Sequence, residues 1–244
     1  MGEVDEIKRL LERCSEAERK AIFDLLRRQF PIHALEAKLN APAELILEAI
    51  DRSSDLIKRG IRGVIAEAAF RLHVVSKLEG WDSQELLGDF PYDFVLQDKL
   101  GKVRVQVKMQ RLKEHVPMTA NQGYRGLPAD MYVVETQRTR GGRDQQTGGD
   151  TRPYRFGEFD ILAVSLQPST DDWTAFIYTV ASWLLPRPEN RRLMLKFQPV
   201  PKSANDLWTA SLETCIDWFR SRERKRILSR RQYAVRGRRT PEDR

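Results

Sequence analysis

The chain of 244 residues has only two cysteines and three histidines. Cys14 and Cys215 both lie in helical patterns, which is typical of buried thiols rather than of a disulfide framework. The three histidines, His33, His73 and His115, are scattered, and no His/Cys cluster has the spacing of zinc ligands. The sequence therefore predicts neither a disulfide-stapled domain nor a zinc site, and it favours a cytoplasmic location.

Long hydrophobic runs are also absent. A helix that crosses a bilayer needs about 20 consecutive apolar residues, and no stretch of the chain provides them. The N-terminus is charged rather than signal-like, so no membrane partner is expected. Positive charge, in contrast, is in excess: the net charge is +7 and the isoelectric point is about 9.5. This balance suits an anionic partner.

A β-hairpin is predicted between residues 92 and 108, where two β-rich runs flank a polar turn. The two runs are Phe94–Leu96 and Val103–Val107, and the turn is Asp98–Gly101. A tight turn places Asp93 roughly opposite Gln106. Because side chains alternate along a strand, Gln106 and Lys108 share one face, while the valines lie on the other with Phe94. We therefore expect a carboxylate, an amide and an ammonium group to gather on one patch, where they could hold a divalent cation.

This spacing resembles the catalytic element of the PD-(D/E)XK nucleases, a superfamily that includes type II restriction endonucleases and archaeal Holliday-junction resolvases. Asp93, a 12-residue gap and Gln106-Val107-Lys108 match its D-X(n)-(E/Q)XK pattern. Two departures matter. The usual proline is displaced by one residue, to Pro91, and Gln106 stands where glutamate is usual, which weakens the metal site. The alternative interpretation is an exposed strand face, and Asp89 is the alternative acidic ligand.

Residues 60–80 are predicted to form one helix before the hairpin. Its apolar stripe, expected to face the core, is formed by Ile61, Val64, Ile65, Ala68, Leu72 and Val75, and the apolar surface is extended by Phe70, Val74 and Leu78. Its polar sector is formed by Arg62, Ala66, His73 and Lys77. Glu67 lies outside the polar sector, so its carboxylate is expected to be partly buried and to need a partner. Glu67 also matches the glutamate that the nuclease superfamily carries on this helix, pointing at the metal site. The alternative is an ion pair with Arg71, four residues later.

The N-terminal region, residues 1–58, is predicted to be a helical module. Two helices are expected over residues 3–29, followed by short helices at 33–39 and 43–50 across a tight turn. This arrangement resembles a helix-turn-helix whose buried apolar set would be Leu35, Leu39, Ala43, Ile46 and Ile50. Glu44 and Glu48 are unusual on a helix that faces phosphates, so a helical bundle packed on the core is an equal alternative.

Polar and basic residues that suit phosphate and base-edge contacts gather in the loops at 110–128 and 136–153. The DNA-binding candidates are Arg111, Lys113, Asn121, Gln122, Tyr124, Arg125, Arg138, Arg140, Arg143 and Arg152. A solvated loop has the same composition. The end of the chain beyond Arg220 is strongly basic and would neutralise phosphates, although a solvated tail has the same appearance.

Together these patterns predict an α/β protein. Residues 59–244 would form a restriction-endonuclease-like core, with a mixed central sheet flanked by helices. Further strands are expected at 81–87, 131–135, 159–166, 174–180 and 193–197, and a helix at 205–220.

The resemblance implies a Mg²⁺-dependent type II restriction endonuclease that cleaves double-stranded DNA at a short sequence as a homodimer. Asp93, the Val107 carbonyl and Gln106 would ligate Mg²⁺, and Glu67 would hold a water or a second metal. Lys108 would orient or deprotonate the attacking water and stabilise charge. The alternatives are a junction resolvase or repair nuclease of the same superfamily and a non-catalytic DNA-binding protein.

Overall fold

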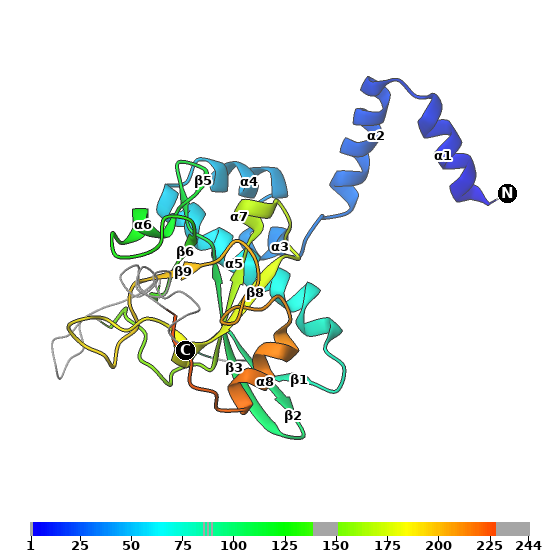
Figure 1. The fold of residues 1–244 in the computed structure, drawn as a ribbon. Coiled ribbons are helices and arrows are strands. Elements are labelled where there is room, and N and C mark those ends of the chain that lie inside the picture. The colour runs from blue at the N-terminus through cyan, green and yellow to red at the C-terminus, as the bar shows by residue number, and fades with distance from the viewer. Residues whose placement is uncertain (1, 85, 87, 89, 139–150, 228–244) are drawn as a thin grey trace. The chain divides into compact units, whose positions relative to one another are not determined.

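A computed structural model describes residues 2–84, 86, 88, 90–138 and 151–227. The chain divides into two compact units, residues 1–59 and 60–244. The second unit is built on a five-stranded mixed sheet with helices beside it (Figure 1). The predicted α/β architecture with a mixed central sheet flanked by helices is confirmed. No helix in the described part of the chain is both long and apolar enough to cross a membrane.

The first unit consists of the helices α1 (Glu3–Arg13), α2 (Glu16–Gln29), α3 (Leu35–Leu39) and α4 (Ala43–Asp51). Helix α2 begins where the sequence indicates, because Ser15 and Glu18 form a reciprocal capping box. None of the residues of these four helices is buried. Leu35 and Leu39 are exposed, so the apolar set expected of a helix-turn-helix is not enclosed within this unit. Glu44 forms an ion pair with Arg27.

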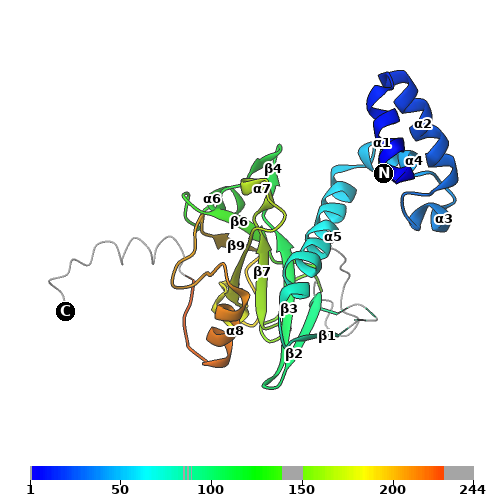
Figure 2. The same cartoon turned by 90° about the vertical axis from the view of Figure 1, so that its right-hand side faces the viewer.

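The central sheet has the strand order β1-β2-β3-β7-β8. Its strands are β1 (Asp82–Gln84), β2 (Phe94–Asp98), β3 (Gly101–Met109), β7 (Ile161–Ser165) and β8 (Phe176–Val180). Only the β3–β7 pair among these is parallel, and Figure 2 shows β3 and β7 side by side. The predicted hairpin is confirmed: Asp98 pairs with Gly101 and Phe94 with Val105. Gly101 has φ +125°, which a residue with a side chain rarely adopts, so glycine suits this turn.

Helix α5 (Asp55–His73) differs from the prediction in its bounds and in the face that it buries. A short 3-10 helix, Val75–Lys77, follows it. The buried residues of α5 are Ala66, Ala69 and Phe70, whereas most of the expected stripe is exposed, namely Val64, Ile65, Ala68 and Leu72. The Phe70 ring centroid lies 5.0 Å from that of Phe94 and 5.4 Å from that of Phe176, so this large side chain docks the helix on the sheet. The expectation for the stripe was therefore wrong, whereas Phe70, on the predicted extension of the apolar surface, is buried, and Val74 and Leu78 pack against the core.

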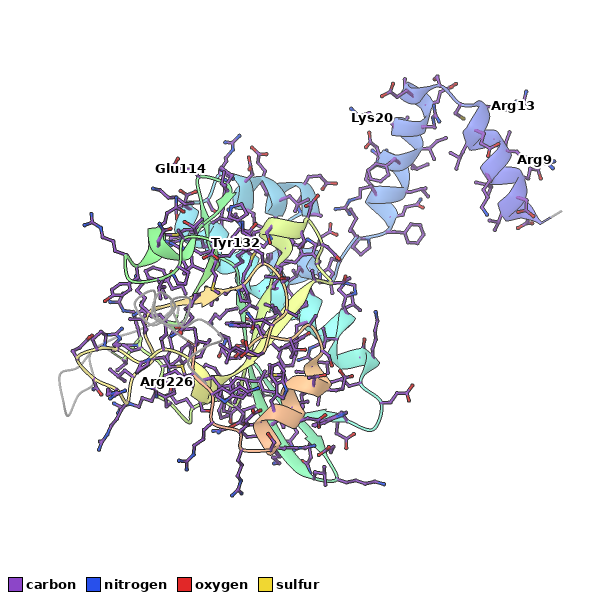
Figure 3. The ribbon with its side chains drawn as sticks, viewed as in Figure 1. Arg9, Arg13, Lys20, Glu114, Tyr132 and Arg226 are labelled. Atoms are coloured by element: carbon purple, nitrogen blue, oxygen red, sulfur yellow. The ribbon has the colours of Figure 1, made fainter. Side chains whose placement is uncertain are left out.

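Smaller elements extend the sheet at one end. The β4–β5 hairpin (Leu112–Lys113 and Val116–Pro117) turns through Glu114 and His115, both with positive φ, and Figure 3 labels Glu114 there. Strands β6 (Tyr132–Glu135) and β9 (Phe197–Val200) form a second pair, with Tyr132 labelled in Figure 3. Two short helices complete this region, α6 (Ala120–Gly123) and α7 (Gln167–Thr170). The last strand therefore lies at 197–200 rather than at the expected 193–197.

A 3-10 helix, Ala181–Trp183, precedes β9, and the C-terminal helix α8 (Leu212–Arg220) follows β9 after an irregular segment. It begins later than predicted, because the Asn205 side chain accepts hydrogen bonds from the backbone of Leu207 and Trp208 and so forms a turn. Arg220 at its end donates to both oxygens of Asp98, at 2.6 and 2.8 Å. This contact ties α8 to the tip of the β2–β3 hairpin.

Candidate active site

Asp93 directly precedes strand β2, just beyond the Phe94–Val105 pair that closes the ladder between β2 and β3. Its backbone N–H donates to the Val105 carbonyl at 3.0 Å. One step further along, Val107 donates its N–H to the Asp93 carboxylate (Oδ2) at 2.7 Å. The side chain thus takes the place of the main-chain acceptor that a continuing strand would supply. This hydrogen bond from the Val107 N–H fixes the carboxylate at the point where the two strands separate.

Gln106 is the most enclosed polar side chain of the site, with 1% of its surface exposed. Its amide nitrogen donates to Asp93 Oδ2 at 2.5 Å and to the Val107 carbonyl at 3.0 Å. An N–H donor therefore stands between two oxygen acceptors that converge on one point. The alternative of an exposed strand face does not describe this residue, since a buried amide held by two partners belongs to an organised site.

Glu67 faces the same site from helix α5. Burial, followed by the negative charge of Asp93, raises the pKa of Glu67 to about 7, and Lys108 opposes this shift. Burial likewise raises the pKa of Asp93, against the effects of Lys108 and of the Val107 N–H. The alternative ion pair is not formed: among the ion pairs of the described residues none joins Glu67 to Arg71, whose guanidinium lies 5.4 Å from the Phe94 ring centroid.

Lys108 supplies the positive charge of the site. It influences both carboxylates, and its ammonium nitrogen lies 5.5 Å from the ring centroid of Tyr154. The structure therefore brings the four predicted catalytic residues together: Glu67, Asp93, Gln106 and Lys108. Two acids of raised pKa beside one lysine are typical of a functional site rather than of a stabilising ion pair.

The oxygen donors of this cluster fit a hard divalent cation. They are the Glu67 and Asp93 carboxylates, the Val107 carbonyl and the amide oxygen of Gln106 if that amide turns over. Carboxylate and carbonyl oxygens are the ligands that Mg²⁺ prefers. The negative charges of the two carboxylates also repel each other, and a cation between them would relieve this repulsion. Within the described residues no group of three His, Cys, Asp or Glu side chains could hold a metal, so a cation here would need the amide and the carbonyl besides the two carboxylates.

The raised pKa of Glu67 predicts a stability gain for Glu67→Gln that depends on pH. The folded protein holds the proton up to about pH 7, whereas the ordinary value is 4.5. Wild-type stability from this group is therefore lost as pH rises from about 4.5 to 7. Above pH 7 in metal-free buffer, we expect the free energy of unfolding of Glu67→Gln to exceed that of the wild type by roughly 1–2 kcal/mol, after allowance for solvent screening. The variant should therefore unfold at a higher temperature. At pH 4.5 the two proteins should melt together, and an equal difference at both pH values would contradict the assignment.

The predicted DNA-binding residues lie in three places. Arg111 is engaged with Glu135 at 3.3 Å, and Lys113 is exposed on β4. Asn121 and Gln122 form the first turn of α6, where Gln122 accepts the Thr119 N–H. Tyr124 and Arg125 follow α6 and are exposed.

Among the described arginines that are predicted to bind DNA, Arg138 lies beside the catalytic cluster. Arg138 approaches the Tyr154 ring at 5.7 Å and forms an ion pair with Glu158 at 2.9 Å. The backbone carbonyl of Arg152 accepts from the Arg138 N–H at 2.9 Å. Arg140, Arg143, Asp89 and the tail from residue 228 lie outside the described residues.

Two residues of the site region were missed or misplaced by the sequence. Tyr154 was given no role, although the Lys108 ammonium nitrogen lies 5.5 Å from its ring centroid. Gln110 was expected in a polar loop, but it is 2% exposed, and neither atom of its amide has a hydrogen-bond partner among the described residues. Because side chains alternate along a strand, continuing β3 by one residue places Gln110 on the same face as Gln106 and Lys108. This period of two is the sequence signal that could have predicted its position.

Comparison with known proteins adds little. No protein-family model matches the chain, and no curated protein matches it. Among solved structures, a bacterial homing endonuclease is similar over 50% of this chain and 69% of its own, with 22% sequence identity and a TM-score of 0.33. A similarity of this strength carries no weight for function, which is inferred below from the site itself.

Proposed function

We propose that this protein is a Mg²⁺-dependent endonuclease that hydrolyses phosphodiester bonds of double-stranded DNA. The observation that carries the proposal is the cluster at the separating ends of β2 and β3. There Asp93 and Glu67, both with raised pKa, meet Lys108 beside a buried amide. The D-X(n)-(E/Q)XK spacing and the net charge of +7 are consistent with a polyanionic substrate.

Hydrolysis requires a water to attack phosphorus, a proton to leave that water, and the P–O bond of the leaving strand to break. Bound Mg²⁺ would supply charge neutralisation and Lewis acidity, held by Asp93, Glu67, Gln106 and the Val107 carbonyl. Glu67 would hold the attacking water beside the metal, and its ionised carboxylate could accept the proton that this water loses. Lys108 would donate hydrogen bonds from its ammonium group to the phosphate oxygens as their charge grows.

Within this class, a type II restriction endonuclease is the proposed specific activity. The polar segment at 110–128 offers side chains for base edges. Incubation of the purified protein with phage DNA and Mg²⁺, with EDTA as the control, tests both levels. Discrete fragments support a restriction enzyme. Cleavage of branched DNA alone identifies a junction resolvase, and a shifted but intact duplex identifies a binding protein and overturns the proposal.

The proposed working form is a homodimer, because each chain has one cluster and two strands must be cut. Sedimentation of the protein with a short duplex that contains its recognition sequence should give two chains per duplex. One chain per duplex would favour a monomer that nicks or cuts the strands in succession.

The two units differ in charge, which predicts where DNA binds. Residues 1–59 contain 11 Lys and Arg against 12 Asp and Glu, whereas residues 60–244 contain 31 against 23. The whole excess of positive charge therefore belongs to the second unit.

We expect Lys113→Ala with Arg125→Ala to weaken DNA binding and to flatten its salt dependence. Each phosphate contact contributes about 0.9 to the slope of log affinity against log salt, so the slope should fall by roughly 1.8. The matched control removes two exposed cations of the first unit, Lys8→Ala with Arg9→Ala, and should leave the slope unchanged. Fluorescence anisotropy with a labelled duplex in EDTA measures both. An equal change in the two double variants would argue against the second unit as the DNA-binding surface.

A further inference from the structure

Tyr154 is held from both sides in the second unit. Its backbone carbonyl accepts the Met194 N–H at 2.9 Å, and the neighbouring Pro153 pairs with Gln137. Its ring meets the Phe159 ring edge-on, with centroids 5.3 Å apart. Only 3% of the residue is exposed. The phenol therefore has a fixed position before any ligand arrives.

The fixed phenol lies between two cations. The Lys108 ammonium nitrogen is 5.5 Å from the ring centroid, and the Arg138 guanidinium carbon is 5.7 Å from it. Against the effect of burial, the Lys108 charge also lowers the pKa of the Tyr154 phenol, so the two groups interact. Arg138 is restrained in turn by Glu158 at 2.9 Å. An aromatic face and a phenol oxygen both attract an ammonium group, so these contacts reinforce each other.

Lysine needs such support more than arginine does, because its charge is a point at the end of a flexible four-carbon stem. An ammonium group has three N–H donors. When the phenol oxygen accepts one of them, the direction of the other two is set and they remain available to a phosphate. A donor that is already aimed at the reacting group avoids reorganisation during the reaction.

Burial raises the pKa of Tyr154, against the effect of Lys108. The phenol therefore stays neutral at neutral pH and acts on Lys108 through its dipole and its oxygen lone pairs. A neutral partner fixes the ammonium group without cancelling its charge, as a carboxylate partner would. This leaves the positive charge of Lys108 to act on the substrate.

We infer that Tyr154 is a positioning residue of the proposed nuclease site, which holds the Lys108 ammonium group in place for the scissile phosphate. The inference rests on the proposed function, because the phosphate is the substrate that this function supplies. It assigns a role to a residue that is separated from the D-X(n)-(E/Q)XK element by the whole of the 110–153 segment.

The test compares Tyr154→Phe with Tyr178→Phe. Both tyrosines are 3% exposed, and the Tyr178 ring packs on Phe70 and, among the described residues, makes no ring contact with Lys108. Tyr154→Phe keeps the ring and removes the hydroxyl. We expect kcat to fall about 10- to 100-fold, the range for losing one hydrogen bond to a charged group, while the Kd for duplex DNA changes less than about twofold. Tyr178→Phe should leave both constants unchanged.

A double variant separates positioning from a structural role. In a Lys108→Ala background, Tyr154→Phe should reduce plasmid nicking by no more than about twofold, because a residue that acts through Lys108 has nothing left to position. Multiplication of the two single effects would overturn the inference.

An independent readout does not need cleavage. In protein labelled with ¹³C-lysine, the Cε signal of Lys108, assigned by its loss in Lys108→Ala, should move in Tyr154→Phe and stay in place in Tyr178→Phe. A signal that does not move in Tyr154→Phe overturns the inference even if the enzyme is active. If the wild type cleaves no DNA but the signal moves, the proposed function fails while the Tyr154–Lys108 contact stands.

Discussion

Asp93→Asn is expected to reduce DNA cleavage on the order of 10³-fold, by analogy with the loss of a key group that stabilises the transition state. The substitution removes one of two carboxylates that would hold Mg²⁺. It keeps the shape of the side chain, and the Asn oxygen can still accept the N–H groups of Val107 and Gln106 that Asp93 accepts now. The measurement is the single-turnover rate of plasmid cleavage with saturating protein.

The same substitution should not weaken the fold. Burial raises the pKa of Asp93, so the ionised carboxylate costs free energy in the folded state at every pH above its ordinary value of 3.8. Asn avoids this cost and also relieves the repulsion from Glu67. In metal-free buffer at pH 7–8, Asp93→Asn should therefore unfold at the same temperature as the wild type or higher. Lost activity with retained stability is the pattern expected of a functional residue.

Asp160→Asn is the matched control, because this carboxylate has the opposite surroundings. Asp160 accepts from Arg104 three times, from the backbone N–H at 2.8 Å, from Nε at 3.0 Å and from Nη2 at 2.7 Å. Neutralising it should lower the unfolding temperature and leave the cleavage rate of the folded protein unchanged. If Asp93→Asn instead cleaves within about tenfold of the wild-type rate, the site does not lie at this hairpin.

The hairpin was predictable from sequence because its information is local. A period of two in hydrophobicity and a turn containing Gly101 set the register, and the register alone places Asp93 beside Gln106. The D-X(n)-(E/Q)XK spacing was therefore enough to assemble this part of the site. Glu67 came from a separate helix, but its position relative to the polar sector indicated partial burial correctly.

The buried face of α5 was not predictable by the same reasoning. Helical periodicity tells which residues share a face, but not which face meets the sheet. The most apolar stripe, with Val64 and Leu72, remains exposed in the described chain, while Phe70 is buried against Phe94 and Phe176. The aromatic contacts of Phe70 rather than the most apolar stripe mark the docking face, and these contacts depend on the shape of the sheet.

Tyr154 could not be placed from sequence because its contacts cross the whole catalytic unit. It lies outside the helices and strands, at residue 154, and no periodicity relates it to Lys108. Its partners become neighbours only when this part of the chain pairs with residues 137 and 138 on one side and with residue 194 on the other. Long-range pairing of this kind has no local signature.

Gln106→Glu is expected to have opposite effects with and without Mg²⁺. Gln106 donates to Asp93 at 2.5 Å and to the Val107 carbonyl at 3.0 Å, and it is 1% exposed. A carboxylate has no N–H, so both attractive contacts would become repulsive in a buried place. We expect the variant to lose about 2–4 kcal/mol of stability in EDTA at pH 8. Near pH 5 the loss should shrink, because two adjacent carboxyl groups can share one proton.

Addition of Mg²⁺ should reverse the loss. Three carboxylates would then surround the cation. Two opposite unit charges about 4 Å apart attract each other by about 4 kcal/mol at an effective dielectric constant of about 20. The Mg²⁺ concentration that gives half of the increase in unfolding temperature should fall by roughly tenfold or more relative to the wild type. The cleavage rate need not follow, since the geometry of the site suits an amide.

Gln110→Glu separates this effect from a general response to buried charge. Gln110 lies on the same face of the same strand and is 2% exposed, but its amide has no hydrogen-bond partner among the described residues and no contact with Asp93. Both variants should unfold at lower temperature in EDTA, and only Gln106→Glu should recover with Mg²⁺. Equal recovery of both would show that Mg²⁺ acts away from this cluster. Recovery of neither would remove Gln106 from the set of metal ligands and leave it as a support for the Asp93 carboxylate.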